Sequence, residues 1–170
     1  MDARLTVLDV MRFRPCEDYG HERVKALWAG RESLTPLEIL DLDIPIQDRL
    51  WCVLSPEVIG ERACRILACD YLGHTLPLWE VRHPGNTGPR VALETAIRYI
   101  NGVATCEELD AAWPAAWDAR TAANAAAWVA AWGYAWDART AAGIANAAAG
   151  GTEREWQLTR TREVLAIEED

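Results

Sequence analysis

The chain has 170 residues, a formal net charge of −9 at pH 7 and a hydrophobic share of 51%. This length fits one domain with a real core. The negative charge disfavours binding to DNA, RNA or anionic lipid through the overall field, and it suits solubility or a basic protein partner. No charge-free apolar run of about 18 residues precedes the alanine-rich region at 111–149, so we expect no membrane insertion.

The five cysteines include no C-x-x-C pair. Charged residues at Asp2, Arg4 and Asp9 interrupt any apolar run at the beginning of the sequence, so no secretory signal is predicted there. Reduced thiols in a cytoplasmic protein are the plain expectation.

Short helices are predicted in the first part of the chain. One covers 17–29 and ends before Gly30. Another covers 36–42, where Thr35 and Glu38 have the spacing of a capping box. Pro45 separates it from a third helix at 46–54.

The pattern then becomes amphipathic. Ser55-Pro56-Glu57 is a helix start, apolar residues follow at three- and four-residue steps as far as Tyr71, and we expect Pro77 to kink or end this helix. After the loop HPGNTGP at 83–89, a helix is predicted to open at Pro89 and to close at Asn101-Gly102. Thr105 and Glu108 then have the spacing of a capping box for the next helix. Strand signals are nearly absent.

The segment AWDARTAA occurs twice, at 116–123 and at 135–142. Alanine is the best helix former, and in each copy the alanines fall on one face, with tryptophan and polar residues opposite. A smooth alanine face allows a neighbouring helix to approach closely. The copies are 19 residues apart, which would rotate the second by about 100° in one unbroken helix. We therefore expect a break near Gly133 and two related helices.

These patterns predict an all-α fold, a compact helical bundle in a single domain over 1–170. Its expected parts are an N-terminal element at 1–34, short helices at 35–102, and alanine- and tryptophan-rich helices with a C-terminal helix at 103–170.

Several segments resemble a known family. TPLEILDLDIPIQDRLWCVL, ERACRILACDYL, GPRVALETAIRYINGVATCEELDAAW and the final EREWQ are similar to small helical proteins of phage and bacterial genomes labelled Imm-5-like immunity proteins. The resemblance implies a role in conflict between bacteria, phages or toxins, in which the protein binds and neutralises a target. It carries no catalytic residue. Its usual loop is more acidic, whereas here Asn86 and Thr87 take the place of any acid.

Two sets of residues are candidates for ligand binding. The loop HPGNTGPR could hold an anion on backbone N–H groups and charged side chains; an ordinary interhelical turn is the alternative. The tryptophans could stack on a base while arginines pair with a phosphate; helix packing and interhelical salt bridges are the alternatives. The candidate residues are Arg82, His83, Asn86, Thr87, Arg90, Trp117, Arg120, Trp128, Trp132, Trp136 and Arg139.

No metal site, cofactor or catalytic set is predicted. Cys64, Cys69 and His74 would point in three directions from one helix, so one metal ion could not collect them. An enzyme acting on a nucleotide is therefore the weakest of three hypotheses.

The leading hypothesis is a non-enzymatic protein that sequesters a small nucleotide immune signal, in an oligomer whose alanine faces pack together. The alternative is an immunity or anti-defence protein that masks a basic effector or toxin by direct binding. In either case we expect no nucleic-acid polymer or membrane as partner, and a cytoplasmic location, within the bacterial host if a phage encodes the protein.

Overall fold

The computed structural model describes residues 3–117, 137–149 and 152–168, and these residues form an all-α protein, as predicted. The helices are α1 (Val7–Arg12), the 3₁₀ turn η1 (Glu17–Tyr19), α2 (His21–Trp28), α3 (Pro36–Leu40), α4 (Ile46–Val53), α5 (Pro56–Arg82), α6 (Gly88–Ile100), α7 (Cys106–Trp117), α9 (Asp137–Ala149) and α10 (Glu153–Glu168). Within these residues, extended pairing is limited to a single bridge between Leu5 and Leu34. No helix described here is both long and apolar enough to cross a membrane.

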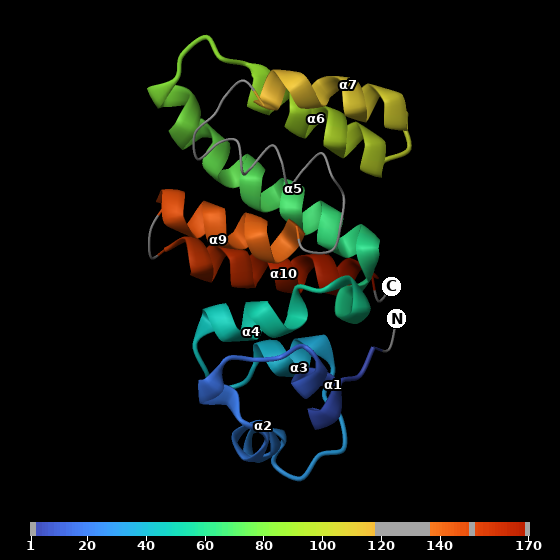
Figure 1. Cartoon of the computed structure of the whole chain (residues 1–170), viewed down its shortest axis with the longest axis vertical. Helices are drawn as coiled ribbons and strands as arrows, with labels where there is room; N and C mark the ends of the chain where they lie inside the picture. The colour runs from blue at the N-terminus through green and yellow to red at the C-terminus, as the bar shows by residue number, and fades with distance from the viewer. Residues whose placement is uncertain (1–2, 118–136, 150–151, 169–170) are drawn as a thin grey trace.

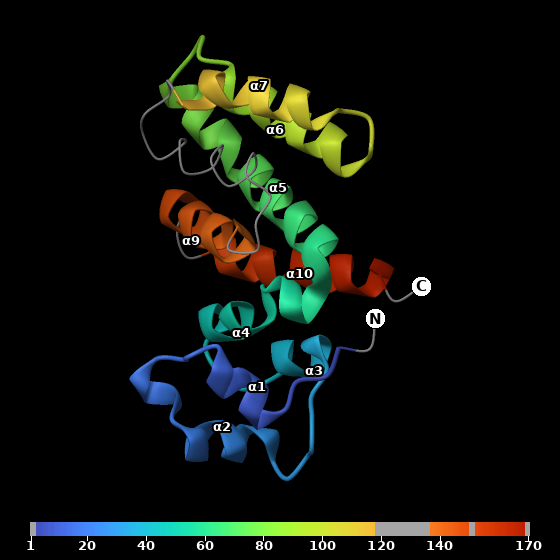
Figure 2. The ribbon, with the colours of Figure 1, turned by 45° about the vertical axis from the view of Figure 1, so that its right-hand side comes forward.

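The helices are stacked along the long axis of the molecule (Figures 1 and 2). The α6–α7 pair lies at one end, α5 runs obliquely beneath it, and α9 and α10 lie side by side in the middle. Helix α4 follows, and the small helices α1, α2 and α3 form the other end. One continuous group of buried apolar side chains extends from Leu5 to Leu165.

Local signals predicted most helix starts. Thr35 and Glu38 make the reciprocal bonds of a capping box, and Thr105 and Glu108 do the same at α7. Helix α6 has a proline in its first turn, and it ends at Asn101. The predicted helix at 17–29 is instead divided into η1 and α2, on either side of Gly20.

The helix does not end at Pro77, because α5 continues through this residue to Arg82. Pro77 is exposed, so water can satisfy the carbonyl group of Gly73 that the missing N–H leaves free. The backbone leaves helical geometry at Gly60 instead, with φ 80° and ψ 156°. Only glycine adopts this region readily. The expectation that 35–102 contains only short helices is therefore wrong.

Helix α9 carries the second AWDARTAA copy, and its alanine face is a packing surface. Ala138, Ala141 and Ala145 are fully buried, and α9 lies against α5. The small side chains allow the two helix backbones to approach closely. In this copy the alanine face is thus covered by a helix of the same chain.

A buried polar layer joins α10 to α5 and α9. The hydroxyl groups of Tyr71 and Thr161 are 2.6 Å apart, and the Gln157 amide donates to the carbonyl oxygen of Ala142 at 2.9 Å. Buried polar groups must find partners, so these bonds fix how α10 sits on its neighbours. This placement brings Arg154, at the beginning of α10, towards α4 and α9.

Candidate functional site

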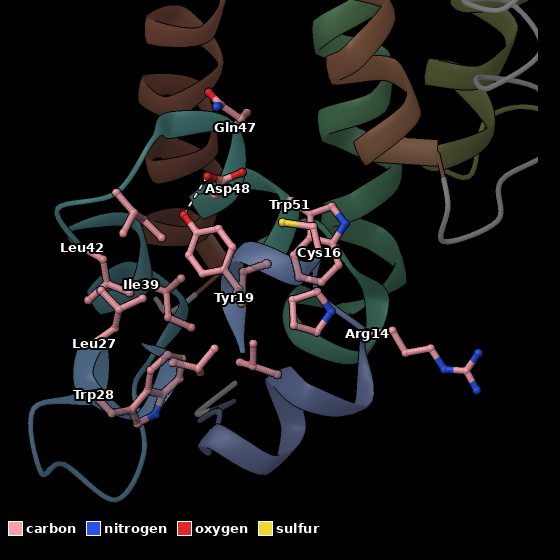
Figure 3. A pocket seen from close by; sticks show the side chains of 15 residues that line it. Arg14, Cys16, Tyr19, Leu27, Trp28, Ile39, Leu42, Gln47, Asp48 and Trp51 are labelled. Carbon is pink, nitrogen blue, oxygen red and sulfur yellow. Dashed lines mark hydrogen bonds between the residues drawn. The ribbon is translucent and has the colours of Figure 1, made fainter. Parts of the chain in front are cut away.

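A cavity of about 480 Å³ lies between the N-terminal helices and the α3–α4 segment (Figure 3). Its volume is within the range of small-molecule sites. The walls are mostly apolar and include three aromatic rings. The apolar and aromatic residues that line it are Val10, Tyr19, Val24, Leu27, Trp28, Ile39, Leu42, Ile44 and Trp51.

The turn between α1 and α2 forms the rim. A capping box between Thr6 and Asp9 starts α1, and Arg14 ends this segment with φ 54°. This left-handed turn redirects the chain so that Pro15 and Cys16 line the cavity. Cys16 is also exposed, which places it at the opening, whereas Arg14 extends away from the labelled rings (Figure 3).

Tyr19 places a hydroxyl group among the apolar walls. It donates a hydrogen bond to Asp48 Oδ2 at 2.7 Å, and the Arg23 guanidinium lies 4.4 Å from the centre of its ring. Burial, together with the bond to Asp48, raises the pKa of Tyr19 to about 12. The hydroxyl group therefore stays protonated at neutral pH, and Asp48 stays engaged as its acceptor.

Two indole rings complete the walls. Trp28 is almost fully buried, and its Nε1–H donates to the carbonyl oxygen of Leu5 at 3.0 Å. Trp51 is half-buried on α4, four residues after Gln47, so both side chains lie on one face of that helix. Trp51 offers a flat apolar surface on which an aromatic ligand can stack, whereas Trp28 has little exposed surface.

Arg139, from the repeat, lies just behind Trp51. Its guanidinium carbon is 4.8 Å from the Trp51 ring centre and 5.9 Å from that of Phe13. Nε and Nη2 are buried and have no hydrogen-bond partner among the described residues. Burial lowers the pKa of Arg139. The interhelical salt bridge that the sequence offered as an alternative for this arginine is not present in the described part of the chain.

A second, smaller cavity of about 140 Å³ adjoins the first, because Gln47 and Trp51 line both. Arg139 and Arg154 contribute the charged groups among its described lining residues. Arg154 donates from Nε to Asn146 Oδ1 at 3.0 Å and from Nη1 to the side-chain oxygen of Gln47.

The loop candidates are brought together in one turn, but their polar groups are used within it. Arg90 makes a bidentate ion pair with Glu80 at 2.6 and 2.8 Å, and Asn86 Oδ1 accepts the Gly88 N–H. His83 stacks on Trp79. These contacts fit the interhelical turn better than an anion site.

The remaining loop candidates add no ligand contact. Arg82 and Thr87 are exposed, and Thr87 stands at the N-cap of α6 without a side-chain capping bond. None of the loop candidates lines either cavity.

The other candidates lie largely outside the described residues. Arg120, Trp128, Trp132 and Trp136 are all in 118–136, and Trp117 is described only as the last residue of α7. Arg139 is thus the one repeat candidate that the structure places in a site, so the tryptophan–arginine hypothesis stays a prediction for the rest.

One pair of titratable residues was not anticipated. His74 Nδ1 lies 2.9 Å from Glu153 Oε2, and its ring stacks on Trp156 with centres 3.8 Å apart. Neither His74 nor Glu153 lines the two cavities. Across the described residues, no three potential metal ligands of the His, Cys, Asp or Glu type are grouped for a metal ion.

Comparison with protein-family models, with curated proteins and with solved structures finds no match to this chain. The resemblance to the Imm-5-like immunity proteins therefore stays a prediction, and the two cavities are the structural features that bear on function.

Proposed function

We propose that this protein is a non-enzymatic binding protein that sequesters a small molecule with an aromatic body in the 480 Å³ cavity. The observation that carries the proposal is the combination of this volume with walls formed by Tyr19, Trp28 and Trp51. Apolar walls with a few directed polar groups are typical of ligand sites. Here the polar groups include the protonated Tyr19 hydroxyl, held by Asp48, and the side chain of Gln47.

A nucleotide immune signal, as predicted from the sequence, suits this proposal because a base supplies the aromatic body. The role in conflict between phages, bacteria and toxins rests on the resemblance alone. Masking of a basic protein by the acidic chain is the competing proposal, supported by the net charge of −9. Co-purification of a basic protein, together with failure of small aromatic probes to bind, would favour masking.

Thermal unfolding with added 1-naphthol or adenosine tests the sequestration proposal. A ligand that binds only the folded state at 100 times its dissociation constant stabilises it by about 2.7 kcal/mol, which corresponds to about 5–10 °C in Tm. We expect such a shift with at least one probe, and intact probe after heat release. An unchanged Tm with both probes would contradict the proposal.

Cys16→Phe tests where the probe binds, because the added ring lies at the opening of the cavity. We expect this variant to fold and to lose the ligand-induced shift. Cys106→Phe is the matched control, since Cys106 is exposed at the beginning of α7 and does not line the cavity. Equal shifts in the two variants would place the probe elsewhere.

A further inference from the structure

The 140 Å³ cavity has an unusual charge for this molecule. Among its described lining residues, Arg139 and Arg154 are charged, no carboxylate is present, and the other polar groups are neutral amides such as Gln47 and Asn146. The whole chain, in contrast, has 26 acidic residues against 17 basic ones. The charge of this cavity is therefore opposite in sign to the net charge of the chain.

Most arginines with described contacts are neutralised by carboxylates. Arg90 pairs with Glu80, Arg98 with Glu108, and Arg160 with both Asp70 and Glu163. The two arginines of the small cavity differ from these. No carboxylate in the described part of the chain lies within ion-pair distance of Arg139 or Arg154.

The unused hydrogen-bonding capacity is concentrated on Arg139. Two of its guanidinium nitrogens are buried without a partner among the described residues, and the guanidinium lies over the rings of Trp51 and Phe13. A buried donor without a partner is costly. Arg139 also lines the cavity, and a guanidinium matches phosphate and carboxylate groups in charge and geometry, so an oxyanion there would interact with its positive charge.

The repeat helix leaves room for such a group. Arg139, Gly143 and Asn146 are spaced along one face of α9, and all three line the cavity. A Cβ atom built on Gly143 would meet no atom within 4 Å, so this position is open space. Glycine is unfavourable inside a helix, yet here it keeps the space between two polar side chains free.

We propose that the small cavity is an oxyanion subsite, in which Arg139 and Arg154 bind a phosphate or carboxylate group carried by the ligand of the larger cavity. This inference rests on the proposed function, since Gln47 and Trp51 line both cavities. The ligand class is then an aromatic body with one oxyanion group. The AWDARTAA repeat has two roles in this arrangement, because its alanine face packs on α5 and its arginine faces the ligand.

Calorimetric titration of the full chain with three matched probes tests the subsite: 1-naphthol, 1-naphthyl phosphate and 1-naphthoate. A hydrogen bond to a charged group corresponds to about tenfold or more in affinity. We therefore expect at least one of the anionic probes to bind about tenfold or more tightly than 1-naphthol. The tighter of the two identifies the group that the subsite prefers.

Variants assign the effect to the cavity. We expect the anionic advantage to fall to about one in Arg139→Met and Arg154→Met, and to be lost in Gly143→Leu, which fills the open space. Arg82→Met removes the same charge from the exposed α5–α6 turn, and Ala147→Leu enlarges an exposed residue of α9. Both controls should keep the wild-type ratio.

The outcomes separate the two proposals. Equal affinities for all three probes, or an anionic advantage that Arg139→Met and Arg154→Met retain, would overturn the subsite and leave the aromatic cavity standing. If Arg82→Met loses the anionic advantage to the same extent, the advantage comes from the overall charge of the protein, and the subsite is also overturned. If no naphthyl probe binds, the proposed function fails. The subsite is then tested separately, by measuring whether inorganic phosphate raises the Tm. A rise that is lost in Arg139→Met supports the subsite, and an unchanged Tm of the wild type overturns it.

Discussion

At the scale of residues, Arg139 is the position at which function and stability are in tension. Its guanidinium is packed against two aromatic rings, while two of its nitrogens have no partner among the described residues. Such an arrangement is unfavourable in the free protein, and the negative charge of an anion bound nearby would offset part of this cost. Residues of this kind are typical of binding sites that are formed before the ligand arrives.

Arg139→Met should therefore leave the free protein as stable as the wild type or more stable. Methionine retains the apolar packing on Trp51 and removes the buried charge. We expect the free energy of unfolding to change by between zero and about +1 kcal/mol, measured by urea denaturation without ligand. A loss of about 3 kcal/mol or more is what breaking a buried ion pair costs. Such a loss would show that Arg139 has a partner and is not free for a ligand.

At the scale of elements, sequence patterns predicted helices well where the signal is local. Capping boxes at Thr35 and Thr105 and the proline in the first turn of α6 set helix starts. The same reasoning failed at Pro77, because the free-energy cost of a proline inside a helix depends on whether the carbonyl group four residues earlier can bind water. It also missed the break at Gly60, since no local pattern distinguishes a glycine with φ 80° from an ordinary helical one.

The repeat provides the sharpest test at this scale. Ala141 is fully buried where α9 packs on α5, and Ala147 on the same helix is exposed. We expect Ala141→Leu to lower the free energy of unfolding by about 1–3 kcal/mol through overpacking. Ala147→Leu should change it by no more than about 0.5 kcal/mol. Denaturant midpoints measure both, and similar values would contradict the packing role of the alanine face.

At the scale of the whole molecule, the site could not be predicted from the sequence because it is assembled from distant segments. The larger cavity combines residues between Val10 and Cys52, and the smaller one adds α9 and α10. Arg139 was a candidate from its repeat, but Tyr19 and Trp51 carried no local signal of a site. Residue type alone also could not show that Arg90 is paired with Glu80, whereas Arg139 has no carboxylate partner among the described residues.

If the ligand binds between the N-terminal helices and α4, the indole N–H signals of the nine tryptophans report it directly. These signals would be recorded by two-dimensional nuclear magnetic resonance and assigned with single Trp→Phe variants, while 1-naphthyl phosphate is added. We expect the Trp28 and Trp51 signals to shift, whereas those of Trp79 and Trp156, which are stacked elsewhere, stay in place. Shifts confined to Trp117, Trp128, Trp132 and Trp136 would contradict this binding site.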